Sequence, residues 1–492
     1  MNRGGNEYIK KDNHDCILVY AILSKGFKVI ENTIHPYLNI IALFFHDLMG
    51  ILTNYILTRH EIERFSFHEN SFPVVREFPH YLSYGDVTRE IRHENKIFKK
   101  QHVGGLQSRI ASYVAVFIER FISKEYIRIG ISSGISLDAD FKCKVFLDAP
   151  TISVPCFNRQ MSILYDCIDE IWETTKLNVS SERMKKLVEN HIHIYIKDQR
   201  SRTTQGVDVF ITRFPAKISQ RIISALCKTN KATVINILHG EGHGIIDEPI
   251  VGYGDKGFAD VMLGYGDYGQ KIWPQFEYAK PLFKEPQYIP SSSDVIKSIY
   301  RSSRVEPLKA LENKKIMYVP TAFSGLRYRY GPFRDMPDVM YLQWQEQLIK
   351  HFPDLIWKGH CKERVRPDLV PSNARYITRE RFEQCLNDVD IFFFDYVASA
   401  FFIACATEKP VIFFDIGLRN ISVEGYESIK KRCIVIDVNV DSVGDLRERV
   451  AAQLKITLDN ELTCRFSLSD NRDQSRYEIL EEWISKDMVV TS

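Results

Sequence analysis

The spacing of apolar positions in this chain becomes regular from about residue 207. Residues 207–212 (VDVFIT) and 232–238 (ATVINIL) are compact apolar runs rich in β-branched side chains. Residues 216–227, between them, carry apolar residues at helical spacing. Strand, helix and strand in this order predict a parallel βαβ unit. Residues 257–263 (GFADVML) predict a further short strand.

The second half of the chain repeats this alternation. Apolar runs predict strands at 315–320, 354–358, 374–377, 389–395, 410–414 and 433–438, and helical spacing predicts helices at 338–351, 379–387 and 399–407. Such alternation is typical of a doubly wound parallel sheet. We therefore expect an α/β protein of two Rossmann-like domains that face a cleft.

The segment 286–294 (PQYIPSSSD) is rich in proline and serine and predicts a linker, followed by a connecting helix at 295–311. We expect an N-terminal domain over 1–290, a C-terminal domain over 291–472, and a helix within 473–492. That last helix, near 474–486, is free to pack back onto the first domain.

The first 200 residues give weaker patterns. Helical spacing is present at 106–123, and short strands are expected at 144–147 and 192–196. The longest apolar stretch, 37–57, is interrupted by Asn39, His46, Asp47 and Asn54. Since a membrane span needs about 20 apolar residues without interruption, a buried or amphipathic helix is expected. Peripheral contact with a membrane is the alternative.

Composition narrows the class of protein. The 492 residues suit two domains. The net charge is only +2, from 65 basic and 63 acidic residues, so we expect no nucleic-acid partner. None of the ten cysteines forms a CxxC pair, as is typical of free thiols in a reducing compartment. Residues 1–14 are polar, so a cytoplasmic location is expected, with the inner face of the membrane as an alternative.

The densest group of chemically active residues is the turn 239–244 (HGEGHG), directly after a predicted strand. Gly240 and Gly242 allow close approach of the backbone to a ligand. His239, Glu241 and His243 supply groups for proton transfer or for phosphate binding. No third metal ligand follows the two histidines, so no metal is expected. The alternative is that the glycines only make the turn.

Polar residues also follow the strands of the second half. Lys358 and His360 suit a nucleotide phosphate or base. The segment 395–400 (DYVASA) contains Asp395 and Tyr396, and Ser399 is expected to cap the following helix and to bind an anion there.

The loop 321–334 (TAFSGLRYRYGPFR) interleaves arginine with aromatic residues. Arg327 and Arg329 could clamp a phosphate. A nucleic-acid single strand is the alternative for this loop, and the near-neutral net charge argues against it.

Standard nucleotide-binding motifs explain little. The chain has no GxxxxGK[ST] loop. The segment 130–134 (GISSG) has no convincing helix behind it, which disfavours a nucleophile elbow. Two GxGxxG matches, at 252–257 and 264–269, lie in a region already rich in glycine, which disfavours a dehydrogenase.

The segments INILHG, FADVMLGYG, IWKGHC and VDIFFFDYVASAFFIACATEKPVIFF, in this order, resemble elements of bacterial surface-polysaccharide glycosyltransferases of the GT-B fold. That group includes capsule and lipopolysaccharide transferases that use CMP-activated Kdo or sialic acid. It also includes the CDP-glycerol glycerophosphotransferases of teichoic acid synthesis. The resemblance covers roughly residues 205–440.

The resemblance implies roles for individual residues. His239 and Gly240 are similar to the family's His-Gly turn at the cleft. Lys358 and His360 are similar to a Lys-x-His-Pro motif that contacts the donor nucleotide, although Cys361 stands where that motif has proline.

Asp395, Tyr396 and Ser399 are similar to an Asp-Tyr-Ser-Ser/Thr segment that holds the donor phosphate. Ala398 and Ala400 flank the one serine that this chain retains.

The implied reaction is a sugar transfer that uses a nucleotide sugar as substrate and requires neither metal nor cofactor. Glu241 is the first candidate for the base that deprotonates a glycan acceptor, with His239 or Asp260 as second choices. Lys358, His360, Arg327 and Arg329 neutralise the leaving nucleotide. The alternatives are a CDP-glycerol-type transferase, a nucleotide-sugar 2-epimerase and a non-catalytic binding protein.

Overall fold

The structure is a computed structural model. It describes residues 7–32, 36–68, 129–131, 144–146, 152–177, 179–196, 207–213, 218–238, 240–300, 304–305, 310–321, 338–359, 375–377, 380–440, 442–454, 458–470 and 474–487. The predicted helix at 106–123 lies outside these residues.

The first sheet has six parallel strands in the described residues. In spatial order they are β2 (Lys144–Phe146), β1 (Ile129–Ile131), β3 (Val209–Thr212), β4 (Thr233–Ile237), β5 (Val261–Tyr265) and β6 (Gln287–Ser291). The order 2-1-3-4-5-6 extends that of flavodoxin-like doubly wound sheets.

The second sheet is also parallel and six-stranded over the described part of the chain. Its spatial order is β10 (Tyr376–Ile377), β9 (Ile356–Lys358), β8 (Ile316–Val319), β11 (Ile391–Phe394), β12 (Val411–Asp415) and β13 (Ile434–Asp437). Counted along the chain, this order is 3-2-1-4-5-6, the Rossmann order. The predicted α/β class with two Rossmann-like sheets is therefore confirmed. A short antiparallel pair, β7 (Arg304–Val305) with β14 (Leu458–Asp459), lies apart from both sheets.

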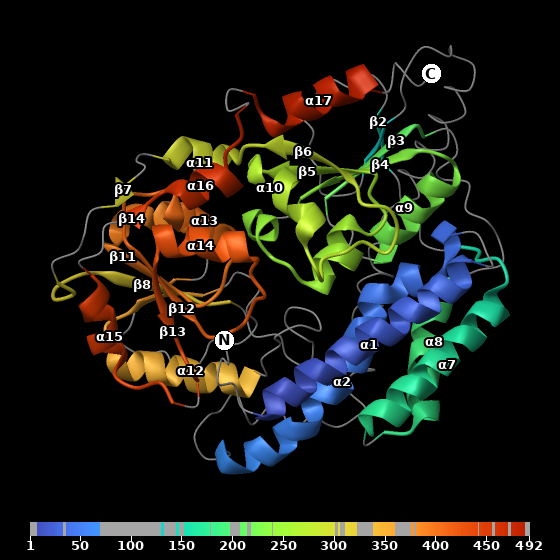
Figure 1. Cartoon of the computed structure of the whole chain (residues 1–492), viewed down its shortest axis with the longest axis horizontal. Helices are drawn as coiled ribbons and strands as arrows, with labels where there is room; N and C mark the ends of the chain where they lie inside the picture. Colours follow the sequence, from blue (N-terminus) through green and yellow to red (C-terminus); the bar gives the residue numbers. More distant parts are fainter. Residues whose placement is uncertain are drawn as a thin grey trace.

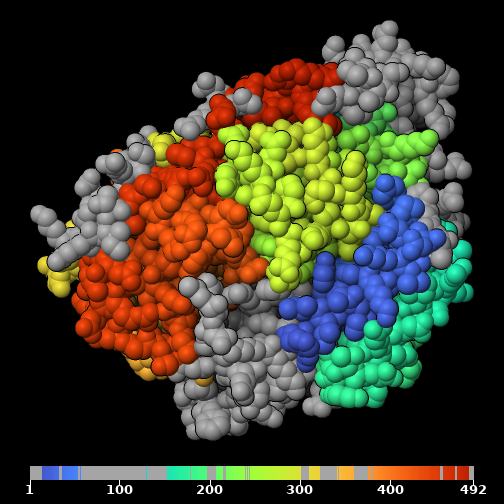
Figure 2. All heavy atoms as spheres, viewed as in Figure 1, coloured from blue at the N-terminus to red at the C-terminus, as the bar shows by residue number. Residues whose placement is uncertain are grey.

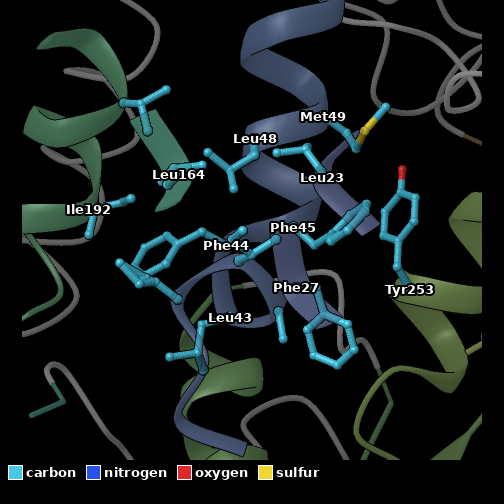
Figure 3. Packing of buried hydrophobic residues seen from close by; sticks show 14 of the residues in the cluster. Leu23, Phe27, Leu43, Phe44, Phe45, Leu48, Met49, Leu164, Ile192 and Tyr253 are labelled. Atoms are coloured by element: carbon cyan, nitrogen blue, oxygen red, sulfur yellow. The ribbon is translucent and has the colours of Figure 1, made fainter. Parts of the chain in front are cut away.

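A bundle of long helices covers one face of the first sheet (Figure 1). Its members are α1 (Glu7–Glu31), α2 (Ile40–His68), α7 (Phe157–Thr175), α8 (Ser181–His193) and α9 (Ile218–Thr229). Figure 3 shows Phe44, Phe45 and Leu48 of α2 between residues of the neighbouring helices. Tyr253, from the 251–256 helical turn η3, closes the same cluster.

The predicted buried helix at 37–57 is confirmed by α2, and its polar residues have structural roles. Asn39 caps the helix, since its side-chain oxygen accepts hydrogen bonds from the N–H groups of Ile41 (2.9 Å) and Ala42 (3.3 Å). Asp47 forms an ion pair with the buried Arg221 of α9. Burial opposes the ionisation of Asp47, but Arg221 and His191 hold the pKa of its carboxyl well below the usual range.

Among the described helices, one segment, Pro36–Thr53, is long and apolar enough to cross a membrane. Its mean hydropathy is 1.3, and 72% of it is buried inside the protein. A core helix of a globular domain has the same properties.

The C-terminal helix α17 (Arg476–Asp487) covers the other face of the first sheet (Figure 1). Ile479, Leu480 and Ile484 pack on alternate residues of the strands, such as Ile235 and Ile237. At the start of the helix, Arg476 donates to the Ser291 hydroxyl (2.9 Å) and to the Leu263 carbonyl (2.9 Å). The last helix is thus part of the first domain's core.

Helices cover both faces of the second sheet. α12 (Asp338–His351) and α15 (Leu446–Gln453) pack on one face. On the other face lie α13 (Ser399–Cys405), α16 (Glu461–Phe466) and the short helix η5 (Phe382–Asp388). This second apolar cluster continues into the first domain through Leu238, Ile245 and Ile246. On the face drawn in Figure 2, atoms of the two domains are in contact along the boundary where this cluster joins them.

Three expectations about helices, strands and linkers are wrong. Residues 192–196 are not a strand: α8, which is capped by Ser180, extends to His193, because Met184, Leu187 and Val188 form a helical apolar face. Most of the expected linker 286–294 is β6, since Tyr288 and Ile289 are buried in the first sheet. The helix expected at 295–311 is only α11 (Asp294–Ile299).

Replacement of Leu480 by alanine tests the role of α17. Leu480 is fully buried, and the loss of a buried leucine side chain lowers the free energy of unfolding by about 2–5 kcal/mol. Urea denaturation followed by circular dichroism measures this loss. Ser485→Ala, on the exposed face of the same helix, is expected to change the free energy by less than about 0.5 kcal/mol. Equal urea midpoints for Leu480→Ala and the unmodified protein would show that α17 is not part of the core.

Candidate functional site

The strand order of the second sheet reverses between β8 and β11. β8 has β9 and β10 on one side, and β11, β12 and β13 on the other. In doubly wound sheets, ligands bind outside the carboxyl ends of the strands at such a switch point. Thr321 follows β8 and Asp395 follows β11, so these two positions mark the candidate site.

Asp395 is buried at the switch point, and aromatic side chains surround its carboxylate. It accepts hydrogen bonds from the Tyr318 hydroxyl of β8, from the Tyr341 hydroxyl (3.0 Å) and from the Trp344 indole N–H (2.8 Å) of α12. The Tyr341 hydroxyl in turn accepts the N–H of Thr321 (3.0 Å). One carboxylate therefore joins the ends of β8 and β11 to the helix between them.

The protonation of Tyr318 keeps this network intact. Burial, and then the neighbouring Asp395 carboxylate, raise the pKa of the Tyr318 hydroxyl well above its usual value. The phenol remains a donor at all ordinary pH values. The resemblance implied that Asp395 helps to hold the donor phosphate. In the structure it is buried beneath the candidate site, where it connects β8, β11 and α12. Its three aromatic donors take up most of its acceptor capacity.

Lys358 is the last residue of β9, next to β8 at the same edge. Its side chain is 7% exposed, and its ammonium donates to the carbonyl oxygen of the adjacent Gly359 (3.2 Å). Among the residues that the structure describes, no carboxylate forms an ion pair with it. A buried cation is stabilised by a negatively charged partner, so Lys358 is a candidate for contact with an anionic ligand.

The segment after Asp395 reaches the surface at Ser399. Tyr396 is half-buried, Val397 is buried and Ser399 is exposed. Ser399 does not cap α13 as expected: Ala398 occupies the N-cap position and has no side-chain oxygen. The first hydrogen bond in the helix runs from the Phe401 N–H to the Ala398 carbonyl (2.9 Å). The N–H groups of Ser399 and Ala400 precede it and have no partner within the helix.

The turn 239–244 lies directly against this segment. It follows β4, and residues Glu241–Gly244 form the short helix η2. Gly240 has φ +90°, and a Cβ added there would lie 3.0 Å from the Ser399 hydroxyl oxygen. A Cβ at Gly242 would lie 3.2 Å from the Val397 carbonyl oxygen. The structure thus brings together two predicted site segments, one from each domain.

Asp260 lies at the amino-terminal ends of the strands of the first sheet, opposite the ends that the turn follows. It precedes β5, forms an ion pair with Lys228, and accepts the N–H of Val234 (2.9 Å) at the start of β4. The turn 239–244 follows the other end of β4, which is about 13 Å away by strand length alone. The structure therefore does not bring Asp260 to the turn, and its role as a base is not supported.

Several predicted site residues are not described. His239, Arg327, Arg329 and His360 lie outside the described residues, and for Glu241 and His243 only the backbone is described. In the described part of the chain, no group of three or more His, Cys, Asp or Glu side chains is arranged to hold a metal ion.

Sequence reasoning missed the partners of Asp395. Tyr341 and Trp344 are three residues apart on a helix that the sequence predicts, so they share a face of it. That spacing was a usable signal for two polar groups directed at one point. Their target could not be identified from the sequence, because Asp395 is distant in the chain.

Comparisons with known proteins add little. No protein-family model matches the chain, and no curated protein matches it. Among solved structures, the chain is similar to a spinosyn forosaminyltransferase, SpnP, at 10% sequence identity, over 75% of this chain and 100% of that one. The TM-score is 0.34, so this likeness carries no argument about function. What the strand orders define is an α/β protein of two Rossmann-like domains.

Replacement of Asp395 by asparagine tests the network at the switch point. Asparagine keeps one acceptor oxygen, and its NH2 group stands where the other oxygen accepted one or two of the three donors. Each donor left without an acceptor costs about 1–3 kcal/mol of stability, which urea denaturation measures. Asp388→Asn is the matched control, because that exposed carboxylate pairs with the exposed Arg375 and contributes little. Equal stability of the two variants would contradict the network.

Proposed function

We propose that the protein is a GT-B glycosyltransferase. In this proposal it moves a sugar from a nucleotide-activated donor to a bacterial surface glycan or a related acceptor. A CMP-Kdo or CMP-sialic-type donor is favoured, on the resemblance of its motifs. The reaction takes place in the cytoplasm or at the inner face of the membrane.

One observation carries the proposal: the contact of Gly240 and Gly242 with Val397 and Ser399. Each sheet contributes one segment from the carboxyl ends of its strands, and the two segments meet between the domains. Ligand sites of two-domain α/β enzymes lie in such places.

Lys358 supplies positive charge for the donor phosphate in this proposal. It lies at the carboxyl end of β9, and its buried ammonium has no described carboxylate beside it. Preorganised charge of this kind stabilises the negative charge that grows on a leaving phosphate. The N–H groups of Ser399 and Ala400, which have no partner within α13, can bind a second phosphate oxygen.

The proposed reaction is a direct displacement. The acceptor hydroxyl oxygen forms a bond to the anomeric carbon of the donor sugar, and the bond from that carbon to the phosphate oxygen breaks. The nucleotide leaves with the electron pair of the broken bond. The proton of the acceptor hydroxyl passes to the carboxylate of Glu241, with His239 as the second choice of base.

Thermal-shift measurements with CMP, CDP, UDP, GDP and their sugars test the donor site. CMP or a CMP-sugar is expected to raise the melting temperature, because a ligand at 100 times its Kd stabilises the folded state by about 2.7 kcal/mol. Lys358→Gln is expected to weaken that binding about 10- to 100-fold, since a hydrogen bond to a charged group is worth about 1.5–3 kcal/mol.

The control is Lys314→Gln, which makes the same change of charge at an exposed position before β8. Its affinity for CMP is expected to equal that of the unmodified protein. If no nucleotide shifts the melting temperature, or if Lys358→Gln and Lys314→Gln bind CMP equally well, the donor site is misplaced.

Replacement of Glu241 by glutamine tests the base. Loss of a general base lowers kcat by about 10²- to 10⁴-fold, while the thermal shift with the donor is expected to persist. Transfer is measured as nucleotide release with a glycan acceptor. Asp260→Asn is the control, because it alters a carboxylate at the distant edge of the sheet and is expected to retain kcat. Full transfer by Glu241→Gln would remove Glu241 from this role.

A further inference from the structure

A short antiparallel ladder joins the two domains directly after the glycine turn. It pairs residues 245–248 of the first domain with 419–422 of the second. Ser422 donates its N–H to the Ile245 carbonyl (2.8 Å), and Asp247 donates its N–H to the Asn420 carbonyl (2.9 Å). Ile246 and Ile421 form the β-bridge between these two hydrogen bonds.

A buried ion pair closes the end of this ladder. Glu248 is 0% exposed and Arg419 is 7% exposed, and their side chains approach to 3.3 Å. The other oxygen of the Glu248 carboxylate accepts the N–H of Asn420 (2.7 Å). The Arg419 guanidinium also lies 5.7 Å from the centre of the Tyr396 ring, within reach of a cation–π contact. Arg419 therefore contacts both the first domain and the candidate donor segment.

Each strand of the ladder is fixed to its own domain. The Asp247 carboxylate accepts the N–H groups of Glu277 (2.9 Å), Tyr278 (2.9 Å) and Ala279 (2.8 Å). On the other side, Ser422 caps α14 (Val423–Arg432) by accepting the Gly425 N–H (3.2 Å). The ladder therefore connects an anchored segment of one domain to an anchored segment of the other.

The ladder aligns the domains, whereas other contacts hold them together. The apolar cluster around Leu238, Val397 and Phe401 belongs to both domains, and it remains if the ion pair is removed. Apolar contacts are not directional, so they do not define how the turn is placed on the donor segment. Hydrogen bonds are directional and can define it, and the Glu248 carboxylate takes part in them by accepting the Asn420 N–H.

We propose that Glu248 and Arg419 are positioning residues of the transferase. They hold the turn 239–244 in register with the segment 395–399, and Arg419 links this register to the donor site through Tyr396. This inference rests on the proposed function, because the register matters for catalysis only if the turn carries the base and the segment 395–399 binds the donor.

The test is hydrogen exchange on a double variant, Glu248→Leu with Arg419→Met. Removal of both charges avoids the uncompensated charge that a single replacement leaves in the interior. We expect exchange of the Asp247 and Ser422 N–H groups, whose carbonyl acceptors the double variant keeps, to become at least tenfold faster. Exchange in the strands β4 and β12 is expected to stay unchanged. The control is Arg375→Met with Asp388→Asn, which removes an exposed ion pair of the second domain.

A second measurement separates positioning from simple stabilisation. In the unmodified protein, CMP is expected to slow exchange of the two ladder N–H groups, those of Asp247 and Ser422, because Arg419 connects the ladder to Tyr396. In the double variant, CMP is expected to bind, as judged by thermal shift, without slowing that exchange. If the donor is turned over, kcat falls while its KM is retained.

The outcomes for the two proposals are distinct. Absence of any nucleotide shift in the unmodified protein overturns the proposed function, whereas ladder exchange in the ligand-free proteins still decides the role of the pair. Unchanged exchange at Asp247 and Ser422 in the double variant overturns that role. Faster exchange throughout both sheets overturns it as well, since it would show that the pair only contributes to global stability.

Discussion

The two domains can meet at the candidate site because two positions in one turn carry no side chain. Any Cβ at Gly240 would press on the Ser399 hydroxyl and require a backbone conformation that other residues rarely adopt, and one at Gly242 would press on the Val397 carbonyl. The shared apolar cluster and the ladder that follows the turn depend on this close approach. Chemistry proposed for the turn is therefore tied to its fit against the second domain.

Charged groups at the carboxyl edge of the second sheet divide into two kinds. The Asp395 carboxylate accepts hydrogen bonds from three aromatic side chains, and these bonds connect β8, β11 and α12. Lys358, two strands away from β11, donates to a neighbouring carbonyl and keeps its charge available for a ligand. The fold thus places a hydrogen-bonded anion inside the wall of the site and, at its edge, a cation that forms no ion pair with a carboxylate of the described residues.

Elements defined by local patterns could be predicted from the sequence, whereas contacts between residues far apart in the chain could not. α12 was predicted to the residue, and β8 and β11 to within a few residues, because a local apolar period defines them. α7 went unpredicted although Met161, Leu164, Ile168 and Ile171 are spaced as one helical face. The partners of Asp395 and the pair Glu248–Arg419 could not be predicted, since each joins residues far apart in the chain. The ladder has no local pattern at all.

The position of α17 has a consequence for the synthesis of the protein. Strands β3 to β6 leave the ribosome long before α17, the helix that covers one face of them in the folded protein. At about 5–20 residues per second, the roughly 190 residues that follow β6 take on the order of 10–40 s to make. During that interval the face formed by Val209, Ile235 and Val261 is open to water, while the second domain already has all of its strands before α17 emerges. The nascent first domain therefore has a period in which a chaperone can bind it.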